Sequence, residues 1–317
     1  MTPVKTILIT GANGFVGSNL YRSLVQDYRL LGVDITTRGK FPPLDIYGWE
    51  ELDSIPHCSA IIHLAGKAHD TSNTTRGEEY FEVNVGLTRK IFDYFLQSQA
   101  EKFIFFSSVK AVADAVKDDV LTEEAIPDPR TPYGRSKLAA EEYINKSAVS
   151  SQQSAVRSIY ILRPVMIHGP GNKGNLNLLY NVVRKSIPWP LGAFDNRRSY
   201  ASIGNVSFVI RQLLERPVEP GIYQVADDEP VSTNDLIRLI ARSLNHRPKI
   251  LRLPPGLIRA LARTGDLLHL PLNSERLKKL TESYVVSNAK LKAALGIEKM
   301  PVDARAGLEA ALRSFQK

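Results

Sequence analysis

A glycine-rich turn near the amino terminus constrains the fold of this chain more than any other feature. Residues 6–10 form an apolar run, Gly11, Gly14 and Gly17 follow at three-residue spacing, and residues 18–26 have the pattern of a helix. Glycine permits the tight turn and close backbone approach that seat a pyrophosphate on a helix N-terminus. The order strand, turn, helix therefore predicts a dinucleotide-binding turn rather than a simple connector. Its Gly-x-x-Gly-x-x-Gly spacing nevertheless differs from the commoner Gly-x-Gly-x-x-Gly.

Strand-like and helix-like segments alternate through the first half of the chain, as repeated βαβ units require. The predicted strands are 6–10, 30–34, 60–64, 102–107 and 158–167, the predicted helices 18–26, 80–97 and 132–146, and shorter helices are predicted at 235–244 and 308–315. This pattern predicts an α/β fold, a Rossmann-type doubly wound parallel sheet with a smaller C-terminal substrate-binding region. We divide the chain into an NAD(P)-binding domain at 1–168, to which 199–226 return, and a mainly substrate-binding region at 169–317.

Composition sets looser bounds on the function of the 317 residues. No apolar stretch reaches the roughly 18 residues of a membrane span, and the first strand starts too early for a signal peptide, so a cytoplasmic location is expected. Cys58 is the single cysteine and is interpreted as a small core residue. The formal charge of +8 is spread along the chain, so no nucleic-acid partner is expected.

Tyr133 and Lys137 lie four residues apart on the predicted helix 132–146, and Ser108 precedes them. This spacing places the tyrosine and the lysine on one helix face. A neighbouring ammonium group favours the phenolate and so lowers the pKa of the phenol, which makes the tyrosine an acid–base group for a carbinol or ketone. The serine hydroxyl can hold the same substrate oxygen. These three residues predict proton transfer at a carbonyl or carbinol oxygen.

Asp34 ends the second predicted strand, which follows the glycine turn and its helix, where a carboxylate would receive the hydroxyls of the adenosine ribose. The same carboxylate would repel a 2′-phosphate, which favours NAD as the cofactor. Arg38 could pair with that phosphate and keeps NADP open, although a solvated surface arginine is the preferred interpretation.

His63 lies near the end of another predicted strand and is followed by the small residues Ala65 and Gly66, which suit close backbone approach to the cofactor. No second histidine lies at i+4 from His63 or His69, so no metal site is expected. We interpret His63 as a structural residue at the strand end.

Taken in order, these residues resemble the extended short-chain dehydrogenase/reductase family, in its nucleotide-sugar epimerase, dehydratase and reductase branch. Further matches to the family pattern are Asn84-Val85, Leu162-Arg163-Pro164, Gly169-Pro170-Gly171, and the late segment 288–291 with Leu295-Gly296. The resemblance covers almost the whole chain. It implies a UDP-sugar substrate and a homodimer.

The resemblance also implies roles for individual residues. Ser108, Tyr133 and Lys137 would be catalytic, Lys137 would bind the nicotinamide ribose, and Asn84 would lie near the nicotinamide. The cofactor-binding residues expected from the glycine turn and the resemblance are Gly11, Asn13, Gly14, Phe15, Val16, Gly17, Asp34, Leu64, Ala65, Gly66, Lys67, Asn84, Tyr133, Lys137 and Pro164. The substrate-binding residues are Ser108, Lys110, Asn175, Leu191 and Arg198, with Asn175 and Arg198 expected on the diphosphate.

Two departures from the family pattern separate the activities of this branch. Dehydratases carry an Asp-Glu pair directly after the catalytic Ser or Thr, where this chain has Val109 and Lys110, which disfavours 4,6-dehydration. Sugar 4-epimerases place an asparagine soon after the late strand's arginine, where this chain has Met166. Residues 189–200, together with residues 162–171 and Pro254-Pro255, resemble those of bacterial reductases of UDP-4-keto-6-deoxy-N-acetylhexosamines, which serve O-antigen and capsule synthesis.

Three functions follow as hypotheses. The favoured one is a nucleotide-sugar 4-ketoreductase that uses NADH or NADPH. The second is a UDP-glucose or UDP-N-acetylglucosamine 4-epimerase, which would use the same residues and hold NAD through catalysis. The third is a non-catalytic dinucleotide-binding module, against which the intact Ser108, Tyr133 and Lys137 argue.

Residues 257–270 combine leucines with Arg259 and Arg263. Such a segment forms a basic amphipathic helix for a membrane surface, or it packs in the core or over the substrate as a lid. We interpret it as core packing or a lid.

Overall fold

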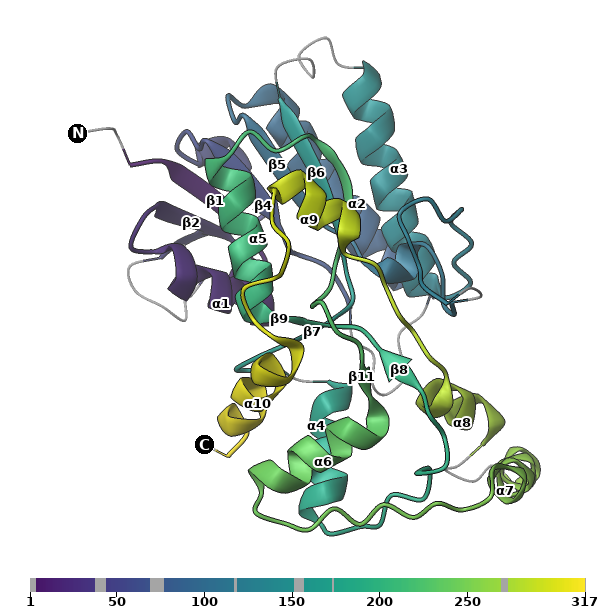
Figure 1. Ribbon diagram of the computed structural model, residues 1–317. Helices are drawn as coiled ribbons and strands as arrows, with labels where there is room; N and C mark the ends of the chain where they lie inside the picture. Colours follow the sequence, from purple (N-terminus) through teal and green to yellow (C-terminus); the bar gives the residue numbers. More distant parts are fainter. Residues whose placement is uncertain are drawn as a thin grey trace.

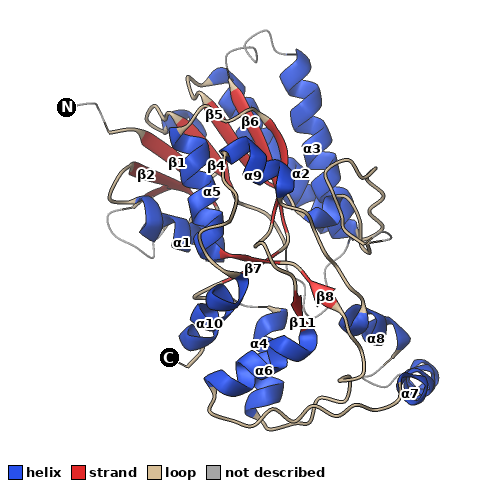
Figure 2. Ribbon diagram, in the orientation of Figure 1, coloured by secondary structure: helices blue, strands red, loops and turns tan. Residues whose placement is uncertain are grey.

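A seven-stranded parallel sheet forms the main layer of the computed structural model, which describes residues 4–37, 44–68, 77–116, 119–150, 157–172, 174–268 and 273–316. The strands run in the order β10-β6-β5-β4-β1-β2-β3, and Figure 2 shows β6, β5, β4, β1 and β2 side by side in red. They are β1 (Thr6–Thr10), β2 (Arg29–Val33), β3 (Asp45–Tyr47), β4 (Ala60–His63), β5 (Lys102–Phe106), β6 (Ser158–Pro164) and β10 (Gly221–Val225). This is the Rossmann-type doubly wound sheet that the sequence predicted.

Helices cover both faces of the sheet (Figure 1). One face packs against α1 (Phe15–Leu24) and α5 (Ile203–Glu215), and the other against α2 (Gly77–Gln97) and α3 (Pro132–Ser150). Successive side chains of a strand point to opposite faces, so Ile7 and Ile9 join the first core while Leu8 joins the second. Burial on both faces explains why the strands read as continuous apolar runs.

Most predicted elements differ from the structure by a few residues at one or both ends, and two of these differences have a clear physical reason. The helix predicted at 18–26 begins at Phe15, because Gly14 is its N-cap in extended conformation. The strand predicted at 158–167 is two strands: β6 ends at Pro164, which has no N–H to continue the ladder. The chain then forms β7 (Met166–His168), which pairs with β9 (Tyr200–Ser202) in a separate two-stranded sheet.

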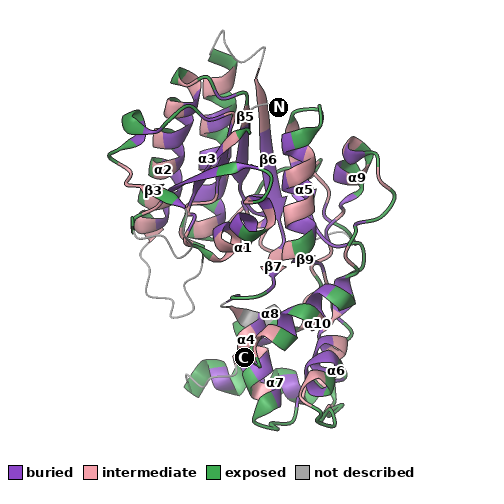
Figure 3. Cartoon of the chain, turned by 90° about the vertical axis from the view of Figure 1, so that its left-hand side faces the viewer, coloured by how far each residue is buried: buried purple, intermediate pink, exposed green. Residues whose placement is uncertain are grey.

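A second apolar cluster lies below the sheet (Figure 3). Its helices are α4 (Asn175–Arg184), α6 (Thr233–Ser243), α7 (Pro255–Leu268), α8 (Ser274–Thr281) and α10 (Ala304–Ser314), and β8 (Arg197–Arg198) pairs with β11 (Val231–Ser232) beside them. The helices predicted at 235–244 and 308–315 overlap α6 and α10. The substrate-binding role assigned to this part of the chain stays a prediction.

The late helix α9 (Ala289–Leu295) departs from this division, because it packs on the main sheet. Leu291 and Leu295 are fully buried in the core that α1 and α5 share with the strands. The helix ends at Gly296 in the left-handed conformation, with φ of +64°. Helix α9 therefore completes the core beside the main sheet, whereas α10 packs in the second cluster.

Replacing Leu291 by alanine should lower the free energy of unfolding by about 2–5 kcal/mol, because it leaves a cavity in the core beneath the sheet. Leu178→Ala, which truncates an exposed leucine on α4, is the matched control and should cost less than about 1 kcal/mol. Denaturant unfolding of the two variants measures the difference. Equal losses would contradict the packing described for α9.

Candidate active site

The glycine turn joins β1 to α1 at the carboxyl edge of the sheet. Gly11 has φ of +69°, and its N–H donates to the carbonyl of Val33 at 2.7 Å. A Cβ at Gly11 would lie 2.9 Å from the backbone nitrogen of Ala65, and one at Gly17 would lie 2.7 Å from the carbonyl oxygen of Ala12. Both positions therefore require glycine, and the strand–turn–helix context that a pyrophosphate site needs is present.

Asp34 follows β2 and fixes the glycine turn from the side. Its Oδ2 accepts from the backbone N–H of Asn13 at 2.9 Å, and its Oδ1 accepts from that of Ile35 at 2.8 Å. A carboxylate has about four lone-pair sites, so Asp34 keeps acceptor capacity for two ribose hydroxyls. Arg38, which could pair with the 2′-phosphate of NADP, lies outside the described residues, as does His69.

The other predicted cofactor residues lie along the same edge of the sheet. Phe15 and Val16 begin α1, Leu64, Ala65, Gly66 and Lys67 follow β4, and Pro164 ends β6. The predicted catalytic residue Ser108 follows β5 at the same edge. Open parallel sheets bind ligands outside the carboxyl ends of their strands, where the strand order reverses. In this sheet the reversal falls between β1 and β4, beside the glycine turn.

Ser108, Tyr133 and Lys137 come together at the end of β5. Tyr133 is the second residue of α3, its side chain is partly exposed, and its hydroxyl shares a hydrogen bond with Ser108. Lys137, one turn further along, is buried, and its Nζ donates to the carbonyl of Phe106 at 2.9 Å. The structure therefore unites the three residues that the sequence analysis predicted as catalytic.

Desolvation is the largest influence on the pKa values of Tyr133 and Lys137. It raises the pKa of Tyr133 above the ordinary 10.0, and the hydrogen bond with Ser108 opposes that rise. It lowers the pKa of Lys137 to about 8, and the nearby Glu141 carboxylate opposes that fall. The expected lowering of the phenol's pKa by Lys137 is therefore wrong, because desolvation of the phenol outweighs its neighbours.

Asn84 on α2 organises the loop that follows β4. Its Oδ1 accepts from the backbone N–H of Lys67 at 2.7 Å, and its Nδ2 donates to the hydroxyl of Ser136 on α3 at 2.9 Å. A Cβ at Gly66 would lie 2.8 Å from Asn84 Oδ1 and 3.2 Å from Lys137 Nζ. The predicted cofactor residues Gly66, Lys67, Asn84 and Lys137 are thus neighbours, and Asn84 holds them together.

A buried relay of hydrogen bonds links His63 to the same loop. Its Nδ1 lies 2.6 Å from the hydroxyl of Thr10, which accepts from the Ala65 N–H at 3.2 Å. Its Nε2 lies 3.0 Å from the hydroxyl of Thr88, which donates to the Asn84 carbonyl at 2.6 Å. Burial holds the pKa of His63 well below 6.5, so the ring is neutral, with its proton on Nε2. This environment supports the structural interpretation of His63.

A buried ion pair beneath the trio was missed in the sequence. Arg163 on β6 donates from Nη2 to Oε2 of Glu141 on α3 at 2.5 Å and from Nε to Oε1 at 3.0 Å, and Ser107 also donates to Oε1. Glu141 lies one turn after Lys137, and this i+4 spacing is the signal that could have found it. The network joins α3, β5 and β6 where Ser108 leaves the sheet.

Lys110 and Arg198, two predicted substrate residues, both lie next to Tyr284, which the sequence analysis did not single out. The backbone N–H of Lys110 donates to Ser108 Oγ at 3.2 Å, and its ammonium group lies 4.1 Å from the centre of the Tyr284 ring. Arg198 forms a β-bridge with Tyr284, whose hydroxyl donates to the carbonyl of Ala113 at 2.7 Å. Tyr284 therefore connects β8 to the loop after Ser108.

The remaining predicted substrate residues lie in the second apolar cluster or at its border. Asn175 is the first residue of α4. Leu191 is only 4% exposed and packs in the cluster that contains Trp189. The structure thus gives Leu191 a packing role, and its contact with substrate stays a prediction.

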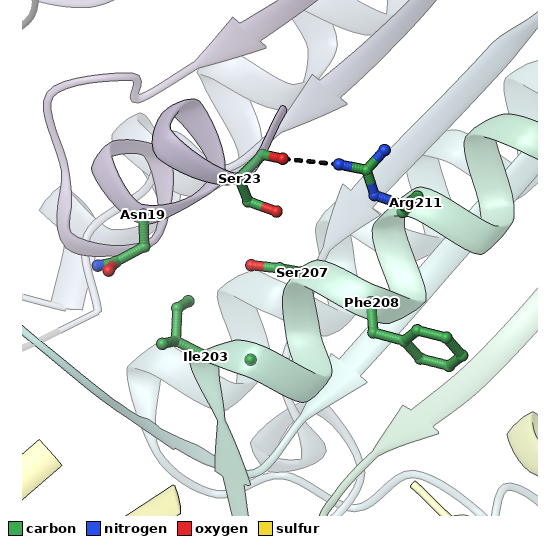
Figure 4. Close-up of a pocket in the computed structure, with 7 residues that line it drawn as sticks. Asn19, Ser23, Ile203, Ser207, Phe208 and Arg211 are labelled. Atoms are coloured by element: carbon green, nitrogen blue, oxygen red, sulfur yellow. Dashed lines mark hydrogen bonds between the residues drawn. The ribbon is translucent and has the colours of Figure 1, made fainter. Parts of the chain in front are cut away.

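A surface hollow of about 370 Å³ lies apart from this site, between α1 and α5 (Figure 4). Its lining residues are Asn19, Ser23, Ile203, Gly204, Ser207, Phe208 and Arg211. Arg211 at its end donates to the carbonyl of Ser23 at 2.7 Å and to Asp27 at 2.7 Å. None of the predicted catalytic residues lines it.

The NAD dependent epimerase/dehydratase family matches residues 7–226, more than half of the chain. The chain belongs to this family. The family is NAD-dependent, as the sequence analysis expected of this chain, and the glycine turn and Asp34 fit NAD.

Cys58 is buried, as expected of a core residue, and burial raises the pKa of its thiol to about 11. No described helix is long and apolar enough to cross a membrane.

Curated relatives agree with this assignment. The chain is 31% identical over 255 residues to a UDP-glucose 4-epimerase of Vibrio cholerae, with 76% of each chain covered. It is 29% identical over 256 residues to the N-acetyl-alpha-D-glucosaminyl-diphospho-ditrans,octacis-undecaprenol 4-epimerase of Escherichia coli O157:H7, with 78% of this chain and 75% of that protein covered.

Two solved structures share the fold over nearly their whole length. MoeE5 in complex with UDP-glucuronic acid and NAD matches with a TM-score of 0.75 and 21% identity, covering 98% of this chain and 99% of that one. WbmG of Bordetella bronchiseptica in complex with NAD and UDP matches with a TM-score of 0.76 and 17% identity, covering 99% and 96%. At such identities the likeness shows the fold alone.

Lys137→Met removes a buried cation and should raise the free energy of unfolding near neutral pH by up to about 3 kcal/mol, since one pKa unit is worth about 1.4 kcal/mol. The folded-state pKa of about 8 lies below the ordinary 10.5. The gain is therefore full below pH 8 and disappears as the pH rises towards 10.5 and the wild-type ammonium loses its proton. Denaturant unfolding of the wild type and of Lys137→Met across this pH range measures the gain in the free energy of unfolding.

Lys146→Met, at an exposed position of the same helix, is the matched control and should show no such pH dependence. A loss of stability on Lys137→Met at every pH would contradict the desolvation of Lys137.

Arg163→Met should cost about 3–5 kcal/mol of stability, because it leaves the Glu141 carboxylate buried without its partner. The double variant Arg163→Met/Glu141→Leu should recover most of that loss. Lys90→Met breaks an exposed ion pair with Glu50 and should cost no more than about 1 kcal/mol. Thermal or denaturant unfolding compares them. A double variant no more stable than the single one would refute the pairing argument.

Proposed function

We propose that this protein is an NAD(P)H-dependent 4-ketoreductase of a UDP-4-keto-6-deoxy-N-acetylhexosamine, in O-antigen or capsule polysaccharide synthesis. The hydrogen-bonded pair of Ser108 and Tyr133 next to Lys137 carries the oxidoreductase part of the proposal. Met166 and residues 189–200, which resemble those of the reductases, favour the reductase over the epimerase. The family and its UDP-sugar relatives support NAD-dependent nucleotide-sugar chemistry as the general activity.

The site residues suit the reduction of a carbonyl. NADH, when bound, supplies a hydride to the C4 carbon. Ser108 orients the carbonyl oxygen, and Tyr133, whose raised pKa keeps it protonated at neutral pH, donates its proton as that oxygen gains charge. Lys137, with a pKa of about 8, is mostly cationic at neutral pH and stabilises the phenolate left behind.

The surroundings of Ser108 argue against elimination of water, which needs an added acid and base. Val109 and Lys110 follow Ser108 where dehydratases carry Asp-Glu. The buried carboxylate of Glu141 is neutralised by Arg163. The carboxylate of Asp114 accepts from the backbone N–H groups of Arg130 and Thr131, at 2.7 and 3.1 Å. The carboxylates of Glu141 and Asp114 are thus engaged in structural interactions, and neither is placed as the added acid or base.

In this proposal the substrate binds on the side of the site that faces the second apolar cluster. Arg198 and Asn175 would contact the diphosphate, and Lys110 would lie near the sugar because its backbone is tied to Ser108. Arginine suits a diphosphate because its forked donors bind two oxygens at once. MoeE5 and WbmG, which share the fold, were solved with NAD and UDP-glucuronic acid and with NAD and UDP, respectively, which supports a UDP-sugar as the substrate class in this proposal. The homodimer is a further part of the proposal.

The second candidate is a 4-epimerase, which the curated relatives from Vibrio cholerae and Escherichia coli O157:H7 favour by their activity. An epimerase oxidises C4 and reduces it again from the other face with the same three residues. The two enzymes differ in their treatment of the cofactor, because an epimerase retains NAD while a reductase exchanges it in every turnover.

Tyr133→Phe should reduce turnover of a UDP-4-keto-6-deoxy-N-acetylhexosamine by about 10²–10⁴-fold, because it removes the proton donor. Binding of NADH, followed by its fluorescence, should change little. Tyr143→Phe on the same helix, whose hydroxyl bonds Asp93, is the matched control and should keep its activity. Activity of Tyr133→Phe near that of the wild type would overturn the mechanism.

A substrate comparison separates the two candidates. A reductase should consume NADH or NADPH only with the keto-sugar and leave UDP-N-acetylglucosamine unchanged. Isomerised UDP-N-acetylglucosamine without net oxidation, together with one equivalent of NAD released on denaturation, would select the epimerase. No turnover of either substrate despite NAD binding would select a non-catalytic module.

A further inference from the structure

Helix α7 lies at the end of the molecule remote from the sheet, and much of it is exposed (Figures 1 and 3). Its buried residues are Ile258, Ala262 and Gly265, on the side that packs towards α8 and the second cluster. Its leucines lie elsewhere on the helix: Leu257, Leu261, Leu267 and Leu268 are 50%, 50%, 78% and 60% exposed. Only part of the apolar surface of α7 therefore packs in the core as expected, and the rest faces solvent.

Three of the four exposed leucines follow helical spacing. Leu257, Leu261 and Leu268 are separated by four and seven positions, so at about 100° per residue they form one stripe along α7. Arg259 and Arg263, one turn apart, form a second stripe on another face, and both are exposed. An apolar stripe and a row of arginines on one helix are the pattern of a helix that lies in a membrane interface, where the long guanidinium side chains reach the headgroups.

The surrounding segment is strongly basic. Residues 247–281 contain eight Lys or Arg and two Asp or Glu, a formal charge of +6 compared with +8 for the whole chain. Arg247, Lys249 and Arg252 precede α7, and all three are exposed. Leu251, between them, is 46% exposed. Positive charge and apolar surface thus coincide in one segment.

We propose that α7 docks this protein on anionic phospholipid bilayers as a peripheral contact. A second copy of this chain fits the stripe less well, because it would bring two surfaces of charge +6 together. Nucleic acid fits less well because its interfaces are polar and would leave the leucines without apolar contacts. An anionic bilayer satisfies both features at once. This inference goes beyond the proposed function and does not depend on it.

Flotation of the full-length protein with vesicles tests the proposal. Vesicles of phosphatidylcholine with phosphatidylglycerol should bind at least about tenfold more protein at low ionic strength than vesicles of phosphatidylcholine alone. Raising the salt concentration should remove most of this difference, because exposed charges are then screened. Equal binding to both vesicles, or none at low salt, would overturn the proposal whatever sugar nucleotide the enzyme uses.

Two variants locate the contact. Leu257→Ser/Leu261→Ser/Leu268→Ser and Arg259→Gln/Arg263→Gln should each reduce binding to anionic vesicles by about tenfold or more. Ile126→Ser/Val149→Ser, which changes two apolar residues that are each 88% exposed outside this segment, should bind as the wild type does. All three variants should keep wild-type thermal stability and wild-type turnover of a water-soluble UDP-sugar.

The outcomes that contradict this placement are distinct. If the leucine variant floats like the wild type, the apolar stripe is not the membrane contact. If that variant changes the oligomeric mass by ultracentrifugation while its vesicle binding is intact, the stripe is an interface between copies of the chain. Loss of flotation in the Ile126→Ser/Val149→Ser variant would equally overturn the assignment to α7.

Discussion

The burial of the Lys137 ammonium group is the constraint on which the rest of this site depends. A cation removed from water costs free energy, and the fold offsets part of that cost with the carbonyl of Phe106 at 2.9 Å and the charge of Glu141 nearby. Glu141 is itself buried, so it needs Arg163, and Arg163 comes from the next strand of the sheet. One buried charge thus fixes the relative positions of α3, β5 and β6, and with them the approach of Ser108 to Tyr133.

The sequence predicted those parts of the site that local pattern determines. Three glycines between an apolar run and a helix are typical of a tight turn with backbone conformations that only glycine readily adopts, so the turn at Gly11 and the strands behind it were predictable. Tyr133 and Lys137 share a helix face by spacing alone. The surroundings of Lys137 were different, because Phe106 and Arg163 belong to β5 and β6, on either side of α3 in the chain. Only the sheet register brings such residues together.

Other features escaped prediction for the same reason. Tyr284 lies far along the chain from Lys110, and no periodicity relates the two residues. The relay through Thr10, His63 and Thr88 needs two strands and a helix in register before its hydroxyl groups meet. For α7, the sequence revealed an amphipathic helix but not how much of its apolar surface the neighbours would cover. Exposure is a property of the assembled fold, so it overturned part of the expectation of packing.

The position of α9 has a consequence for how the chain can be divided. The family match ends at residue 226, just after β10, and suggests a dinucleotide-binding unit that could be cut out at that point. Leu291, Leu295 and Met300 nevertheless fill the same core as α1 and α5. A fragment ending at 226 would expose an apolar hollow on its sheet and would tend to aggregate. The matched segment is thus a unit of sequence comparison but not a unit of folding. During synthesis, the core that α1 and α5 share with the sheet therefore stays incomplete until residues 289–300 have left the ribosome.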